Sequence, residues 1–285
     1  MGIKAVMSSQ IFEKMPDVMD KIDNRRLDIQ RVGVRSVRRP MNFRDRKGGI
    51  VPTIGNFGTY VRLDNRKRGT HMSRFIQLLE EIEEPLSVES FIPLVKSMIK
   101  RLESVEGVIT VDFPFFLVKN APITAIAGHM DYDVGLTGFV NKQNSRMQLT
   151  LRVPVSTLCP CSREISEYGA HNQRSSVRLT IQTNLHVWVT DLIELIEKSA
   201  SCDLFSVLKR PDEKFVTEYA YDNPKFVEDI VRDIARTLTR DNRILFFEVE
   251  SENFESIHNH SAYAYLRHGT PFRPLEESLT DHLNY

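Results

Sequence analysis

Two cysteines and a histidine stand close together in this sequence. Cys159 and Cys161 are separated only by Pro160, and His171 follows ten residues after Cys161. A thiolate and an imidazole can share one metal ion, and this pair of donors suits Zn, Fe or Mn. The Ser, Gly, Asn and Pro residues around them are typical of turns, so both groups are expected on a loop and its exit.

The spacing alone leaves two interpretations open. A Cys-x-Cys pair is shorter than the usual zinc-finger spacing, and Pro160 biases Cys159 toward an extended backbone. The two thiols are therefore not expected to bind the same metal ion together. On this basis the cysteines could be metal ligands, or they could be buried or redox-active thiols.

The surrounding residues resemble the signature of GTP cyclohydrolase type IB, a metal-dependent family that opens the guanine ring at the start of pterin and folate synthesis. Four further motifs resemble the same family, so the resemblance covers nearly the whole chain. The motifs are residues 157–162 with 168–174, 208–213, 223–229, 258–260 and 69–75.

The resemblance implies one divalent metal ion per subunit, Mn, Fe or Zn, held by Cys159, His171 and Glu213. Three protein ligands leave a position for water, as catalytic metal sites require. A metal ion lowers the pKa of its bound water toward neutrality, and in the family this water attacks carbon 8 of guanine. Cys161 is a further candidate for a catalytic or loop-shaping role.

Three more residues acquire roles from the resemblance. Glu228 is expected to anchor guanine, because a carboxylate can accept hydrogen bonds from the ring N–H and the exocyclic amine, a pair of donors that adenine lacks. His258 and His260 flank a single residue, so in an extended segment both point to the same side. Two imidazoles placed together can act as proton donor and acceptor near neutral pH.

The triphosphate of GTP needs a local cluster of cations, because 38 Lys and Arg residues balance 38 Asp and Glu residues. This zero net charge gives no general attraction to nucleic acid or to an anionic membrane. Lys209, Arg210 and Arg174 lie beside the metal motifs. A second basic cluster could reach a neighbouring subunit's site, and it comprises Arg66, Lys67, Arg68 and Arg74. The residues expected to be structural are His71, His129, His186 and Cys202.

The composition is that of a soluble globular protein. Hydrophobic residues make up 41% and charged residues 27% of the 285 residues, an ordinary mixture for such proteins. Three cysteines, an odd number, argue against a disulfide framework and favour the reducing cytoplasm. No apolar run is long enough for a signal peptide or a transmembrane helix.

Hydrophobic periodicity predicts the same order of elements in both halves of the chain. The first half is expected to hold strands near 27–37, 60–63, 109–113 and 134–140, with helices over 72–82 and 87–102. The second is expected to hold strands near 149–153, 177–181, 247–249 and 262–266, with helices over 190–202 and 223–238. The expected helix caps are Ser87, Thr190 and Asn223, the last followed by Pro224 at the first helical position.

This order predicts an α+β fold of antiparallel hairpins with helices on one face. The resemblance implies two tandem tunnelling-fold units, 27–143 and 144–285, of which the second carries the metal site, after an N-terminal arm over 1–26. Open sheet edges would be closed when subunits assemble into a barrel. A homo-oligomer is therefore expected, a tetramer as in the family.

The expected function is that of a GTP cyclohydrolase, which converts GTP and water to 7,8-dihydroneopterin triphosphate and formate. Three alternatives remain open. The archaeal branch of the family yields a cyclic phosphate product, and a nitrile reductase of the same fold superfamily uses a Cys nucleophile and a nicotinamide cofactor, although no glycine-rich dinucleotide loop is found. A non-catalytic metal or redox module would use the cysteines but not Glu228 or the histidine pair.

Overall fold

A computed structural model describes residues 19, 21–46, 49–183 and 185–272. Most of the expected arm over 1–26 and the end of the expected second unit lie outside these residues. No helix within the described ranges combines the length and apolar character needed to cross a membrane.

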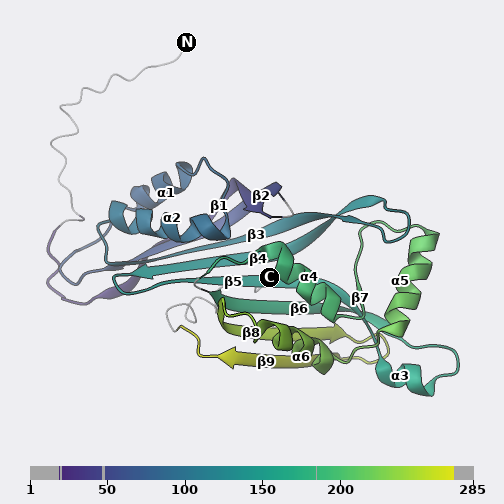
Figure 1. Cartoon of the computed structure of the whole chain (residues 1–285). Helices are drawn as coiled ribbons and strands as arrows, with labels where there is room; N and C mark the ends of the chain where they lie inside the picture. The colour runs from purple at the N-terminus through teal and green to yellow at the C-terminus, as the bar shows by residue number, and fades with distance from the viewer. Residues whose placement is uncertain (1–18, 20, 47–48, 184, 273–285) are drawn as a thin grey trace, which may run out of the picture.

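One antiparallel sheet runs through the described chain (Figure 1). Its strands follow the order β1-β2-β3-β4-β5-β6-β8-β9, and the short β7 pairs with β5. Every pair of neighbouring strands in this order is antiparallel, and strands that follow one another in sequence lie next to one another in most of the sheet. The strands are β1 Ile29–Asp45, β2 Gly49–Leu63, β3 Glu106–Asn120, β4 Ala127–Asn141, β5 Ser145–Leu158, β6 Asn172–Thr183, β7 Cys202–Asp203, β8 Ile244–Phe254 and β9 Ser261–Gly269.

The larger helices lie on one side of this sheet, and α3 and α5 lie at one end of it (Figure 1). Helix α2 contacts β3, β4 and β5, while α4 contacts β5 and α6 contacts β8 and β9. This arrangement confirms the predicted α+β class. The helices are α1 Met72–Glu80, α2 Val88–Arg101, α3 Pro160–Ile165, α4 Val189–Ser199, α5 Arg210–Asp222 and α6 Val227–Leu238.

Alternation along the strands gives the sheet one apolar and one polar face. The register pair Leu151 and Leu179 belongs to a core that is continuous across both halves of the chain. In the adjacent pair, Thr150 and Thr180 point to the other face, where their hydroxyl oxygens lie 3.3 Å apart. The face opposite the apolar core is therefore polar, and it also carries Gln148, Gln182, Arg178 and Glu250.

The expected start of the helix at Asn223 is wrong. Helix α6 begins at Val227 with Phe226 as its N-cap residue, and Asn223 is the C-cap residue of α5. The Asn223 side chain donates to the carbonyl of Tyr219 at 2.7 Å, so it serves the preceding helix. The Asp229 carboxylate accepts from the Phe226 N–H at 3.0 Å, which satisfies a donor that the helix itself leaves free.

A buried aspartate at the end of β1 caps α4 from a distance. Asp45 is 3% exposed and accepts hydrogen bonds from the N–H groups of Val189 and Thr190, both at 3.1 Å. Thr190 was expected to cap this helix, but the N-cap residue is Trp188. The Thr190 hydroxyl donates instead to Asp45 at 2.6 Å. The first half of the chain thus supplies the cap of a helix in the second.

We predict that Asp45→Ala lowers the free energy of unfolding by about 2–4 kcal/mol, because buried N–H groups at the start of α4 lose their acceptor. Urea denaturation followed by circular dichroism measures this change. Asp64→Ala is the matched control, since its carboxylate is about half exposed and pairs with the exposed Arg66. A loss in Asp45→Ala no larger than in the control would contradict the capping role.

Candidate functional site

The strand ends of β5 and β6 bring Cys159 and His171 together. The last pair of the ladder is Leu158 with Asn172, and the Cys159 N–H then donates to the His171 carbonyl at 3.1 Å. Residues directly opposite one another on antiparallel strands present their side chains on the same face, with Cα atoms about 4.5–5.5 Å apart. Two of the three expected metal ligands, Cys159 and His171, are thus neighbours on adjacent strands.

The connection between these two residues is more ordered than the expected loop. Helix α3 begins directly after Cys159, which is its N-cap residue, and Pro160 lies in its first turn. Cys159 is half-buried, while Cys161 on α3 is exposed. A proline suits the first turn of a helix because no N–H donor is needed there.

One nitrogen of the His171 ring is held by its own strand and by a distant loop. Nδ1 lies 3.0 Å from Oε1 of Gln173 and 3.2 Å from Oγ of Ser256. Gln173 is buried and its amide donates to the Thr157 hydroxyl at 2.9 Å. Because a Gln Oε1 can only accept, this contact favours the tautomer with the proton on Nδ1, and in that tautomer Nε2 is the nitrogen left for a metal ion. Sequence reasoning missed both Gln173 and Ser256.

Ser256 belongs to the connection between β8 and β9, which also carries the two expected catalytic histidines. The rings of His258 and His260 are stacked, with centroids 5.2 Å apart and planes 13° from parallel. Both side chains are exposed. The two histidines do lie side by side, but they do so in a bend rather than in the extended segment that the sequence suggested.

The start of α6 is attached to the same strand end. The Lys225 N–H, in the connection from α5 to α6, donates to the carbonyl of Leu158 at 3.1 Å. Glu228 follows in the first turn of α6 and is exposed. The expected guanine anchor is therefore on a helix whose entry is hydrogen-bonded to the residue before Cys159.

Glu213, the third expected ligand, lies in the first turn of α5 and is exposed. Its carboxylate has no hydrogen-bond or ion-pair partner among the described residues. Within the same residues, no three or more His, Cys, Asp or Glu side chains are gathered closely enough to hold a metal ion. The structure thus pairs Cys159 with His171 but does not gather Glu213 with them.

The expected phosphate-binding residues fall into two places. Lys209 and Arg210 are exposed at the start of α5, and Arg174 is exposed on β6 opposite Ser156. Three members of the second cluster, Arg66, Lys67 and Arg74, line a separate cavity of about 730 Å³ beside the end of β2, and the fourth, Arg68, is exposed but is not part of that lining. Some of this charge is already paired, since Arg66 contacts Asp64 and Lys67 contacts Glu103.

The residues that were expected to be structural occupy varied positions. His71 is the N-cap residue of α1, and His129 is exposed on β4. His186 packs edge-on against Trp188, with ring centroids 4.0 Å apart. Cys202 is buried in β7, and burial raises the pKa of its thiol to about 11, so the thiol stays protonated at neutral pH.

Asp212, which sequence reasoning did not select, fixes the start of α5. Its fully buried carboxylate accepts from the N–H groups of Ile123 and Thr124 at 2.9 and 2.8 Å, from the Thr124 hydroxyl at 2.7 Å and from the Lys209 N–H at 2.9 Å. Burial alone would raise the pKa of Asp212, but these four donors hold it well below its usual range. The β3–β4 turn thereby positions the helix that carries Glu213.

Comparison with known proteins places most of the chain in one family. A family model described as type I GTP cyclohydrolase FolE2 matches residues 15–264. The GTP cyclohydrolase FolE2 of Azoarcus sp. strain BH72 is 50% identical over 262 residues, which are 91% of this chain and 97% of that protein. The protein of the same name from Magnetococcus marinus is 51% identical over 255 residues, 90% of this chain and 96% of that protein.

Similar solved structures include a uricase from Arthrobacter globiformis. It aligns with a TM-score of 0.53 over 87% of this chain and 97% of its own, at 10% sequence identity. At this identity the likeness concerns the fold alone.

We predict that Asp212→Asn lowers the melting temperature by roughly 5–10 °C, because an amide cannot accept all four hydrogen bonds. Differential scanning calorimetry measures this shift. Asp229→Asn is the matched control, since Asp229 has the same third position in α6 but accepts only from the Phe226 N–H and faces Arg232. An equal shift in both variants would show that Asp212 is an ordinary cap.

Proposed function

The chain belongs to the type I GTP cyclohydrolase FolE2 family, and on this premise we propose that it hydrolyses GTP to 7,8-dihydroneopterin triphosphate and formate in folate biosynthesis. The observation that carries the proposal is the pairing of Cys159 with His171 at the end of β5 and β6. The entry to α6 and the β8–β9 connection are hydrogen-bonded to the same strand ends. Segments distant in sequence therefore meet where the reaction is expected.

A single divalent ion, Mn, Fe or Zn, held by Cys159, His171 and Glu213, forms part of the proposal. The fixed Nδ1 of His171 supports it, because histidine ligands usually donate their other ring N–H to a neighbouring acceptor. Glu213 is exposed and has no partner within the described ranges, so its carboxylate is available as the third ligand. When bound, the ion would supply Lewis acidity and make water nucleophilic near neutral pH.

The remaining steps belong to side chains. Glu228 accepts hydrogen bonds from the guanine ring N–H and exocyclic amine, and it thereby orients carbon 8. One of His258 and His260 protonates nitrogen 7 as water adds at carbon 8, and the pair moves protons again when a second hydrolysis releases formate. Their stacked and exposed rings support this role, because two imidazoles lie together with access to solvent.

The triphosphate is assigned to Lys209, Arg210 and Arg174, which are exposed on α5 and β6. The second basic cluster, which includes Arg66, Lys67 and Arg74, would serve the site of a neighbouring subunit. The protein carries no net charge, so a triphosphate needs cations gathered at its binding site.

A homotetrameric barrel of tandem tunnelling-fold units, 27–143 and 144–285, completes the proposal. Strand β9 ends the sheet and pairs with no strand on its outer side among the described residues, and β1 forms only a single bridge there, at Leu86. Open edges of this kind favour pairing with another chain. The odd cysteine count supports a location in the reducing cytoplasm.

The alternatives are less well supported. The family match over nearly the whole chain favours GTP hydrolysis over a nitrile reductase and over a non-catalytic metal module. The archaeal branch differs only at the phosphate end of its product, and mass spectrometry of the product separates a triphosphate from a cyclic phosphate.

We predict that pure protein releases formate from GTP when Mn²⁺ is supplied, and that chelation of the metal stops the release. Cys159→Ala and His171→Ala should lower formate release by at least about 1,000-fold, because each removes a metal ligand. Their bound metal, measured by plasma mass spectrometry, should fall in parallel. His129→Ala, an exposed histidine on β4, is the control and should keep both properties. Retention of metal and activity in Cys159→Ala would remove the central assignment.

We also predict that Glu228→Gln lowers kcat/KM for GTP by about 100-fold, because the loss of a charged acceptor for two guanine donors costs about 3 kcal/mol. The preference for GTP over inosine triphosphate, which lacks the exocyclic amine, should shrink at the same time. Steady-state formate release with both nucleotides measures the two effects. Glu218→Gln on the exposed face of α5 is the control, and an unchanged nucleotide preference in Glu228→Gln would exclude the anchor.

A further inference from the structure

Strand β4 does not extend along β5 as far as the end of β5 that precedes Cys159. Pairing of β4 with β5 stops at Asp133 and Arg152, six residues before Leu158. Beyond that point the two-residue strand β7 takes the place of β4, with Val155 opposite Asp203 and Ser156 opposite Cys202. So short a ladder supplies few backbone hydrogen bonds, so side chains must hold β7 against β5.

Ser201, directly before β7, makes the contacts nearest to Cys159 on this side. Its N–H donates to the Ser156 carbonyl at 3.1 Å, and its hydroxyl accepts from the Leu158 N–H at 3.0 Å. Ser201 is fully buried. The backbone donor of the residue before Cys159 is therefore satisfied by one serine hydroxyl.

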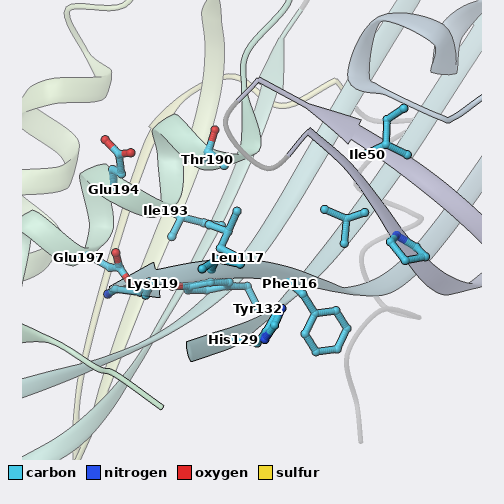
Figure 2. A pocket seen from close by; sticks show the side chains of 13 residues that line it. Ile50, Phe116, Leu117, Lys119, His129, Tyr132, Thr190, Ile193, Glu194 and Glu197 are labelled. Carbon is cyan, nitrogen blue, oxygen red and sulfur yellow. Dashed lines mark hydrogen bonds and ion pairs between the residues drawn. The ribbon is translucent and has the colours of Figure 1, made fainter. Parts of the chain in front are cut away.

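Lys119 on β3 holds the segment around Ser201 from both ends. Its ammonium lies 2.8 Å from Oε1 of Glu197 and 2.9 Å from Oδ2 of Asp203, and the Tyr132 hydroxyl donates to the same Glu197 oxygen at 2.8 Å. Figure 2 shows Lys119, Tyr132 and Glu197 side by side at one end of a cavity. Glu197 lies on α4 and Asp203 on β7, so Lys119 contacts both ends of the segment 197–203.

The side chains of Lys119 and Glu197 are only 14% and 8% exposed. Burial raises the pKa of Glu197, and the ammonium of Lys119 opposes this rise. A buried carboxylate is costly without a cation beside it, so removal of Lys119 should free Asp203 and leave Glu197 with the Tyr132 hydroxyl as its remaining partner. The segment between them, which includes Ser201, would then lose its ion pairs to β3 and keep only its short backbone ladder to β5.

We infer that Lys119 and Ser201 are positioning residues for the candidate metal site. Lys119 fixes residues 197–203, and Ser201 in turn fixes the backbone of Leu158, so that Cys159 stays opposite His171. Neither residue touches the substrate in this scheme. The relevance to catalysis rests on the proposed function, whereas the mechanical link from Lys119 to Leu158 does not.

Hydrogen exchange in the metal-free protein tests the mechanical link. Ser201→Ala removes the acceptor of the Leu158 N–H, so that amide should exchange at least about tenfold faster. Lys119→Met should change it in the same direction. Lys119→Arg should restore slow exchange, because a guanidinium can bridge both carboxylates and the adjoining cavity of about 640 Å³ leaves room for it.

Titration with Mn²⁺, followed by electron paramagnetic resonance, tests the consequence for the site. Ser201→Ala and Lys119→Met should weaken Mn²⁺ binding by about 10-fold or more, as is usual when the support of a metal ligand is removed. Lys214→Met is the matched control, because it breaks an exposed ion pair with Glu218 on α5. Circular dichroism confirms that each variant is folded before it is compared.

The inference is overturned if Ser201→Ala and Lys119→Met change Leu158 exchange and Mn²⁺ affinity no more than Lys214→Met does. It is also overturned if Lys119→Arg behaves like Lys119→Met, because the ion pairs would then not be the cause. A wild-type protein that releases no formate would contradict the proposed function alone, since exchange at Leu158 is measured without metal or GTP.

Discussion

The hydrogen bond from the Cys159 N–H to the His171 carbonyl is the contact on which the candidate site depends. It extends the β5–β6 ladder by one pair beyond the regular strands. Because side chains alternate along a strand, a register slip by one residue would turn Cys159 and His171 to the opposite face. The apolar alternation farther along both strands fixes this register, since the same slip would expose Leu151 and Leu179. Burial of the core and placement of the site are therefore one constraint.

Other parts of the chain attach to this strand end through backbone groups and short polar side chains. Leu158 offers its carbonyl to Lys225 and its N–H to Ser201, and Ser256 reaches the ring of His171. Each contact ties a different connection to the same place. The start of α6, which carries Glu228, and the loop that carries the histidine pair are thereby positioned by a rigid sheet.

Buried aspartates connect the helices to distant strands. Asp45 at the end of β1 caps α4, and Asp212 at the start of α5 accepts donors from the β3–β4 turn. In both cases a carboxylate satisfies N–H groups that a helix or a turn leaves free. The two halves of the chain share one sheet and one continuous core, and Asp45 and Lys119 add polar links between them.

The α+β class, the order of the main strands along the chain and the helix that Ser87 caps could be predicted from the sequence, because these follow from local periodicity and capping chemistry. Its motifs also determined the family, which the comparisons show. The ligand set and the metal stay predictions. The sequence did not reveal helix α5, the true start of α6 or the distant cap of α4. Asn223 and Thr190 have side chains typical of helix caps, but in the structure they bond Tyr219 and Asp45 instead.

Tertiary structure alone decided which side chains support the site. Nothing local distinguishes Gln173 from other polar strand residues, and its role arises only because His171 lies two residues away on the same face. Lys119 and Ser201 are about 80 residues apart in sequence, and the fold joins them through β7. Local pattern encodes an element and its exposed face, whereas a buried polar contact depends on where the rest of the chain brings a matching donor or acceptor.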